Sequence, residues 1–500
     1  MTKHQLFSSR RALAGLSALA LASASLLGMS AASAETTLGD INFDETGSIT
    51  VHKHKHQNES EPVEANPDGS ESIATEGLNG VTFTVKKLEF DLTDPTVWDD
   101  LADLDPAGLT CGGSGGVVTG TVDGVDGVAE FSSLELGVYL VCETDAPDEV
   151  IDRADPFIVT VPYPNQFAGD SAGTWLYDVH VYPKNSTGDN PVKSVGAPSG
   201  LELGSTVDFP VEITIPTVGT AGFTGFTVSD DLDARLTPVG DGVESVMVGG
   251  SEVDTGNYDV TTSGNEVTVT FTDPEGLNFL ATKQGATLTV TFQATVTGVG
   301  TIDNTAIVNV NGKDFTSNEV FTSWGDIEIT KQDSDNELPL NGAVFEIYPA
   351  ATPYPTAGAE CANVIEAGAS ALSFGDPGET TFTTSVDGTV VIPGVFVSDS
   401  NTIPSSTVRC YVLVETVAPA GYVLPDNPNT AVKVSASATT EVGITLGAEV
   451  TINNTKQDVP QLPLTGAQGQ LLMVFGGAAV LLTGAGLMVA SRRKSASKSE

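Results

Sequence analysis

Short runs in which apolar and polar residues alternate recur along the whole chain, and they constrain its fold more than any other feature. Alternation with a period of two places every second side chain on one face of an extended strand, and stretches with helical periodicity are nearly absent. The runs are closed by Gly, Asn, Asp or Pro; examples are VTFTV (81–85), FIVTV (157–161), VEITI (211–215), EVTVTF (266–271), TLTVTF (287–292), AVFEI (343–347) and YVLVE (411–415). Many half-buried strands in succession predict an all-β chain built of β-sandwiches.

The first and last thirds of the chain repeat one scheme. GSITVHKHK (47–55) corresponds to GDIEITKQD (325–333), NGVTFTVKKL (79–88) to NGAVFEIYPA (341–350), and GVYLVCETDAP (137–147) to RCYVLVETVAPAGY (409–422). The middle third does not share the scheme and is expected to be a sandwich of a different kind. Turn residues near 185–191 and 323–325 are expected to interrupt the strands. We therefore expect three domains in tandem, at residues 35–186, 187–324 and 325–458.

The two ends of the chain indicate export. Residues 1–34 combine basic residues, an Ala/Leu-rich run and a closing Ala-Ser-Ala, which predicts a removable signal peptide. At the other end LPLTG (462–466) precedes an apolar segment, 471–490, that is long enough to span a bilayer, and then a basic tail. A stable single-span membrane protein is the alternative interpretation of this end.

The mature chain is very acidic. Removing both ends takes away seven of the 21 basic residues and one of the 65 acidic ones, which leaves 14 against 64 and a net charge of −50. Such a charge argues against binding nucleic acid through a basic surface. It suits a solvated object on the cell surface.

Four cysteines fall in the outer thirds, two in each. An exported chain with an even count and local spacing predicts two disulfides, Cys111 with Cys142 and Cys361 with Cys410. No close Cys-x-x-Cys spacing indicates a metal site.

Alternation in the last domain directs three polar residues towards its core. Lys331 shares a strand face with Ile327 and Ile329, Asn454 follows Ile452 on a face of the last strand, and Glu415 ends the apolar YVLVE run. Burying these groups without partners would be costly. One interpretation is a buried Lys–Glu salt bridge with a hydrogen-bonded asparagine. The other is chemical: a desolvated lysine loses its proton and attacks the amide, while a protonated glutamate polarises it.

YVLVETVAPAGY resembles the E-box of Cna-type B domains in sortase-assembled pilins of Gram-positive bacteria, and the shaft pilins of actinomycetes and corynebacteria are the nearest type. The resemblance implies three Ig-like sandwiches in an elongated array, ordered Cna B-like, Cna A-like and Cna B-like. It makes Lys331 and Asn454 the residues of an isopeptide bond and Glu415 its catalytic acid, with Asn453 as the alternative that alternation disfavours.

The same resemblance implies a second bond in the middle domain. Its residues would be Lys193, Asp230 as the catalytic acid, and Asn304, with Asp231 and Asn318 as reserves. The first domain has Lys53, Glu143 and Asn185 in corresponding places, but whether it forms a bond stays open.

WLYDVHVYPKN resembles the pilin motif of the family, in which the lysine is the acceptor amine. The matching residues are Trp175, Val179, Val181, Tyr182, Pro183 and Lys184. Pro183 cannot donate a ladder hydrogen bond, which favours presentation of Lys184 at a strand end. LPLTG resembles the family's sorting signal, which a membrane sortase cleaves between Thr465 and Gly466. The expected product is a covalent bond from Thr465 of one subunit to Lys184 of the next.

The expected function is therefore a structural fimbrial shaft subunit, secreted, anchored to the cell wall and used in adhesion. Its expected partners are a class C-type pilin sortase, identical subunits, tip and base pilins, peptidoglycan, and a host or bacterial surface receptor. No cofactor, metal or enzymatic turnover is expected.

His52, His54 and His56 alternate on one strand, but an exposed start of the strand is a better interpretation than a metal site. The alternative function is a monomeric wall-anchored adhesin, which would not need Lys184.

Overall fold

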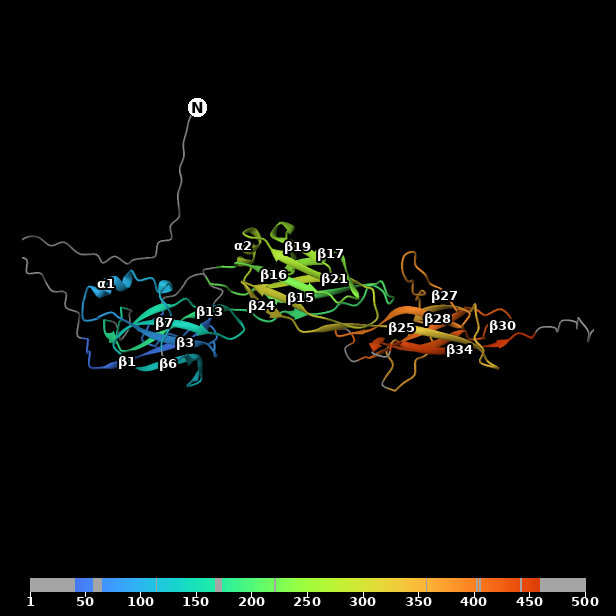
Figure 1. The fold of residues 1–500 in the computed structure, drawn as a ribbon, viewed down its shortest axis with the longest axis horizontal. Helices are drawn as coiled ribbons and strands as arrows, with labels where there is room; N and C mark the ends of the chain where they lie inside the picture. Colours follow the sequence, from blue (N-terminus) through green and yellow to red (C-terminus); the bar gives the residue numbers. More distant parts are fainter. Residues whose placement is uncertain are drawn as a thin grey trace, which may run out of the picture.

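Three successive β-sandwich units form an elongated array (Figure 1). The computed structural model describes residues 41–56, 65–113, 115–166, 173–219, 222–356, 358–401, 403, 406–440 and 443–458. Strands dominate these residues, which confirms the all-β prediction. The expected signal peptide at 1–34 and the sorting signal at 459–500, with its apolar segment 471–490, lie outside the described residues. No helix within the described ranges is long and apolar enough to cross a membrane.

The first unit has a core between two four-stranded sheets. Its strands are β1 Thr46–His52, β2 His54–Lys55, β3 Thr82–Leu88, β4 Val117–Val118, β5 Gly120–Val122, β6 Val125–Glu135, β7 Gly137–Asp145, β8 Val150–Asp152, β9 Phe157–Val161, β10 Tyr163–Pro164, β11 Trp175–Leu176, β12 Asp178–Val181 and β13 Lys184–Thr187. The sheet orders are β12-β1-β6-β5 and β4-β3-β7-β9, and the short strands β2-β13-β8 form a third sheet. Ile49, Val51, Phe83 and Val141 belong to the core. The short helices α1 Val97–Ala102 and η1 Pro106–Gly108 follow β3.

The middle unit packs two five-stranded sheets against each other. Its strands are β14 Val192–Lys193, β15 Thr206–Thr214, β16 Phe226–Asp231, β17 Leu236–Val248, β18 Ser251–Glu252, β19 Tyr258–Ser263, β20 Glu266–Phe271, β21 Thr287–Val296, β22 Gly300–Asn304, β23 Ala306–Val310 and β24 Lys313–Thr316. The orders are β14-β15-β21-β17-β18 and β19-β20-β16-β23-β24. In β21 every second residue from Leu288 to Val296 is buried, as the alternation predicts. The helices α2 Glu275–Ala281 and η2 Thr255–Asn257 complete the unit.

The third unit is arranged around the long strand β25. Its strands are β25 Val320–Asp333, β26 Val344–Pro349, β27 Phe382–Thr383, β28 Thr389–Asp399, β29 Val408–Val417, β30 Tyr422–Val423, β31 Asn429–Ser435, β32 Ala438–Thr440, β33 Gly443–Thr445 and β34 Ala448–Lys456. One sheet has the order β22-β25-β34-β30 with β28 also on β25, and the other has the order β27-β26-β29-β31. The first and last strands, β25 and β34, pair in parallel.

No turn separates the middle and third units. Strand β25 begins on β22 of the middle unit and continues to β28 and β34 of the third, with register shifts around Trp324. The expected interruption of the strands at residues 323–325 is therefore wrong, because these residues lie within a strand that stays paired on both sides of the junction. Leu203 N–H donates to Gly394 O at 2.8 Å and Phe396 N–H to Leu201 O at 2.8 Å, which ties the two units together a second time.

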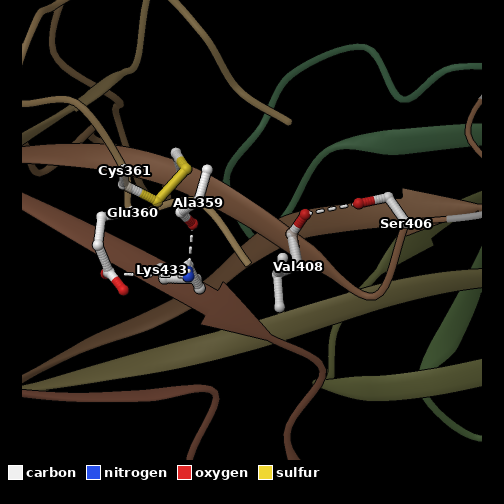
Figure 2. Close-up of a disulfide and its surroundings, with 7 residues drawn as sticks. Ala359, Glu360, Cys361, Ser406, Val408 and Lys433 are labelled. Carbon is white, nitrogen blue, oxygen red and sulfur yellow. Dashed lines mark hydrogen bonds and ion pairs between the residues drawn. A yellow bond between two sulfur atoms is a disulfide. The ribbon is translucent and has the colours of Figure 1, made fainter. Parts of the chain in front are cut away.

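Both predicted disulfides are present, Cys111–Cys142 and Cys361–Cys410. Figure 2 shows the surroundings of the second one, where Lys433 Nζ donates to Ala359 O at 2.9 Å and lies 3.9 Å from Glu360. The bridge and these contacts fasten the loop that carries Cys361 to β29 and β31. In each outer unit the disulfide is formed by a strand that also carries an acidic residue of interest, β7 with Glu143 and β29 with Glu415.

Candidate functional site

Three side chains from three strands meet in the core of the third unit. Lys331 on β25 donates from Nζ to Oδ1 of Asn454 on β34, and its Nζ lies 3.1 Å from Oε2 of Glu415 on β29. Asn454 in turn donates from Nδ2 to Glu415 Oε1 at 2.7 Å. All three residues are at most 2% exposed. The structure thus brings together the lysine, acid and amide that strand alternation selected.

Strand register explains why Asn454 rather than Asn453 meets the lysine. In the parallel pair of β25 and β34, Lys331 stands opposite Ile452 and Asp333 opposite Asn454. Side chains on the core face are two residues apart, so Lys331 and Asn454 are diagonal neighbours on that face. Asn453 points to the other face and is exposed.

A second set lies buried in the middle unit. Lys193 on β14 forms an ion pair with Oδ2 of Asp230 on β16, and Asn304 at the end of β22 donates from Nδ2 to the same oxygen at 3.3 Å. Among the described residues, Oδ1 of Asp230 and Oδ1 of Asn304 have no hydrogen-bond donor. Of the two reserve candidates, Asp231 is exposed, and Asn318 contacts the backbone of Lys193 rather than its amine.

The first unit contains a third set, which the sequence left open. Lys53, between β1 and β2, donates from Nζ to Asn185 Oδ1 and lies 2.9 Å from Glu143 Oε2. Asn185 on β13 donates from Nδ2 to Glu143 Oε1 at 2.6 Å. This arrangement repeats that of Lys331, Glu415 and Asn454 contact for contact. The family resemblance had named Asn185, but strand alternation could not place it in the core, because β13 is a strand of only four residues.

Burial favours the neutral form of each lysine. Desolvation lowers the pKa of Lys53 to about 8, against the opposing effect of Glu143. Desolvation also lowers the pKa of Lys193 and of Lys331, and it raises the pKa of Asp230. A neutral amine is a nucleophile, and a protonated carboxyl group can donate to a carboxamide oxygen. The three sites therefore hold amine, acid and amide in a dry environment suited to amide exchange.

Each lysine amine also lies near phenylalanine rings. Nζ of Lys53 is 5.6 Å from the ring centre of Phe83, and Nζ of Lys331 is 6.0 Å from that of Phe345. Phe83 pairs with Glu143 across β3 and β7, and Phe345 with Glu415 across β26 and β29. These phenylalanines were not singled out by the sequence analysis, although both occupy the same place in the repeated NG-x-x-F segments. They contribute the apolar surroundings that exclude water.

Lys184 stands at the junction of the first and middle units. It begins β13, where it pairs in parallel register with His54, and it directly precedes the buried Asn185. His54 N–H donates to Pro183 O at 3.1 Å, so the proline offers an acceptor where it lacks a donor. The strand-end position expected for Lys184 is the one the structure gives it, partly exposed.

The histidines of the HKHKH segment are more buried than expected. His54 is 7% exposed and His52 and His56 are half-buried, so the interpretation as an exposed start of the strand is wrong. His52 stacks on Tyr182 with ring centres 4.9 Å apart, and its Nε2 lies 2.8 Å from Nδ1 of His180. The rings serve as packing between β1 and the segment preceding Lys184. In the described part of the chain, no three His, Cys, Asp or Glu side chains are grouped as a metal site would require.

Family comparisons cover nearly the whole mature chain. Residues 44–186 match the Gram-positive pilin subunit D1, N-terminal domain; 200–324 the cell surface antigen I/II C2 terminal domain; 325–448 the prealbumin-like fold domain; and 454–497 the LPXTG cell wall anchor motif. The matched pilin and anchor families are structural proteins of the secreted, wall-anchored class rather than enzymes, in agreement with the prediction.

Whole-length relatives agree with these matches. The chain is 36% identical to the fimbrial subunit type 2 of Actinomyces naeslundii, over 97% of this chain and 96% of the relative. It is 30% identical to the fimbrial subunit type 1 of Actinomyces viscosus, over 98% and 99%. Among solved structures, the full-length major pilin SpaD from Corynebacterium diphtheriae superposes with a TM-score of 0.66 at 30% identity, covering 84% of this chain and 99% of that one. The chain therefore belongs to the sortase-assembled major pilins of Gram-positive bacteria, the structural shaft subunits of their fimbriae.

Proposed function

We propose that the subunits are polymerised by an amide bond from Thr465 of one copy to Nζ of Lys184 in the next. A sortase thiolate attacks the Thr465 carbonyl, the bond to Gly466 breaks, and the Lys184 amine then displaces the thiolate. The observation that carries the proposal is the complete pattern from Trp175 to Lys184 in the same chain as an anchor region at 454–497.

Donor and acceptor are different surfaces of the molecule. The tail bearing Thr465 leaves the third unit after Lys456, whereas Lys184 lies between the first and middle units. A head-to-tail contact between different surfaces does not close on itself and grows a filament. An elongated array of three units suits this mode of growth.

Each unit would form one internal Lys–Asn isopeptide bond. In the third unit Nζ of neutral Lys331 attacks Cγ of Asn454, the Glu415 carboxyl group polarises the carboxamide and relays a proton from the amine to the leaving nitrogen, and ammonia departs. Lys193, Asp230 and Asn304 take these roles in the middle unit. Lys53, Glu143 and Asn185 take them in the first. The contacts among buried amine, acid and amide support the assignment.

These cross-links would protect the filament against tension. A sandwich without a cross-link has a net stability of roughly 5–15 kcal/mol. Joining the first and last strands of the third unit lets force pass from β25 to β34 without separating them. The bond is a maturation event that occurs once per molecule and is not turnover.

The remaining partners follow from this assembly. A class C-type pilin sortase would make the Lys184 bond, tip and base pilins would cap the filament, and peptidoglycan would receive its last Thr465. Adhesion to a host or bacterial surface receptor is the proposed use. We assign the units as Cna B-like (35–186), Cna A-like (187–324) and Cna B-like (325–458).

Gel electrophoresis of wall extracts, followed by mass spectrometry of the bands, tests the polymer. A ladder of covalent multimers containing a Thr465–Lys184 cross-linked peptide is expected. A single wall-linked species without that peptide would instead support the monomeric adhesin. Intact mass after reduction of the disulfides should fall short of the sequence mass by one ammonia for each internal bond.

A further inference from the structure

The backbone of Lys193 is held by a single side chain, that of Asn318. The amide N–H of Lys193 donates to Asn318 Oδ1 at 2.9 Å, and Asn318 Nδ2 donates to the Lys193 carbonyl at 2.9 Å. Lys193 lies on β14, a strand of only two residues. On its other side β14 pairs with β15, so the asparagine takes the place of a missing neighbouring strand.

In the outer units the corresponding lysines are held by the main chain. Lys53 N–H donates to Gly127 O at 2.8 Å and the Lys53 carbonyl accepts from Leu78 N–H at 2.9 Å. Lys331 N–H donates to Gly388 O at 2.7 Å and its carbonyl accepts from Leu340 N–H at 2.8 Å. Only for the middle lysine does one side-chain amide supply both groups. A single substitution can therefore remove the contacts that hold the Lys193 backbone, whereas the main-chain contacts of Lys53 and Lys331 cannot be removed in this way.

Asn318 also connects the lysine to the strand of its reaction partner. It lies two residues before Val320, which pairs with Asn304 across β25 and β22. The adjacent Ser317 exchanges hydrogen bonds with Ala306, through Ser317 N–H to Ala306 O and Ala306 N–H to Ser317 Oγ, both at 2.9 Å. Asn318 therefore fixes the Lys193 backbone relative to the segment that holds Asn304.

We propose that Asn318 is a positioning residue for isopeptide formation between Lys193 and Asn304, and not an alternative bonding partner. Both polar atoms of its carboxamide are used on the Lys193 backbone. The proposal rests on the proposed function of the middle triad. Displacing a reacting group by about 1 Å can cost on the order of 100-fold in rate, so loss of this clamp should slow the bond markedly.

Pulse-labelling of the full secreted chain, with mass spectrometry of the cross-linked peptides over time, measures the rate at which the Lys193–Asn304 bond forms. Asn318→Ala should slow appearance of the Lys193–Asn304 peptide about tenfold or more, while the Lys331–Asn454 peptide in the same molecules appears at the normal rate. Asn318→Asp keeps the oxygen that accepts from the Lys193 amide but loses the donor to its carbonyl, so it should also form the Lys193–Asn304 bond more slowly than the unsubstituted chain. The adjacent exposed Glu319→Ala is the matched control and should not change either rate.

Hydrogen exchange in an Asp230→Ala background, where no middle bond can form, separates a role of Asn318 in folding from its role in positioning Lys193. Adding Asn318→Ala there should leave protection of β16 and β21 unchanged; a loss of protection across the unit would make Asn318 a folding residue and overturn the proposal. A normal rate of the middle bond in Asn318→Ala would overturn it as well, and so would a Lys193–Asn318 cross-link. Absence of the Lys193–Asn304 bond from the unsubstituted chain would instead refute the proposed function of the triad.

Discussion

Lys331 donates a hydrogen bond from its amine to the carboxamide of Asn454, although the two residues are 123 positions apart in the chain. They stand near the C-terminal ends of the first and last strands of the third unit, which pair in parallel. Glu415 contacts both, at 3.1 Å from the amine and 2.7 Å from the amide nitrogen. A bond between the two residues would enclose almost the whole unit in one covalent loop.

Glu415→Ala should leave Lys331 and Asn454 unreacted, because no carboxyl group remains to polarise the amide. The mass of the mature chain should then rise by one ammonia, beyond the change of side chain. A cross-link around a loop of this length stabilises by on the order of 5 kcal/mol in the chain-entropy description, so the third unit should melt more than about 10 °C lower. It should also extend under force, yet still polymerise through Lys184. A full mass deficit in this variant would refute the triad.

Asn454→Ala and Asn453→Ala form a matched pair. Asn454 is 2% exposed and faces Lys331, whereas Asn453 is exposed on the opposite face. Only Asn454→Ala should abolish the third-unit bond, as measured by the cross-linked peptide in a digest. Loss of the bond in the Asn453 variant alone would show that the register of β34 differs from the one described.

Lys184→Ala should abolish the polymer and leave the subunit folded and secreted. The change removes the acceptor amine at the start of β13 and leaves the core residue Asn185 in place. Electrophoresis of wall extracts should show monomer only. Lys55→Ala, a partly exposed lysine opposite Asn185 on the neighbouring β2, is the control and should retain the ladder. A high-mass ladder in the Lys184 variant would contradict the assignment.

Thr465 should be the last residue of the subunit in assembled fibres, joined to Lys184 of a neighbour or to the wall. This follows from LPLTG ahead of a removable segment. Mass spectrometry of purified fibres should detect peptides that end at Thr465 and none from residues 471–490. Finding that apolar segment in fibres would show that the chain keeps it as an anchor.

The first unit should loosen in acid through His52. Burial lowers the pKa of His52 to about 4 from 6.5, and the neighbouring His180 and His54 act in the same direction. The unfolded chain therefore binds this proton more readily than the folded one. The contribution of neutral His52 to the stability of the first unit is therefore complete above about pH 6.5 and is lost as the pH falls towards 4.

Hydrogen exchange of the β1 and β12 amides between about pH 7 and pH 4, corrected for the intrinsic rate, measures this loosening. His52→Phe keeps a ring against Tyr182 and should weaken the pH dependence, while the lowered pKa values of His54, His56 and His180 preserve the rest of it. An equal dependence in both proteins would exclude His52 as its origin.

The sequence by itself determined what depends on local order. Alternation with a period of two fixes which side chains of one strand share a face, so it separated Asn454 from Asn453 and placed Lys331 and Glu415 in the core. The signals at both ends and the cysteine spacing are local in the same sense. The sortase-pilin family was therefore recognisable from short segments alone.

The tertiary structure decided what depends on pairing between distant strands. Three relations are of this kind: Asn185 meets Lys53, β25 continues unbroken from the middle unit into the third, and Asn318 holds the backbone of Lys193.

 Lys53 and Asn185 lie 132 positions apart in the chain, and Lys193 and Asn318 lie 125 positions apart. Such pairings are set by how whole sheets pack and by the register of strands that meet only after folding. A local pattern carries no information on that register, which is why the sequence offered Asn185 as a candidate without deciding whether it meets Lys53, and why the role of Asn318 emerged only from the folded chain.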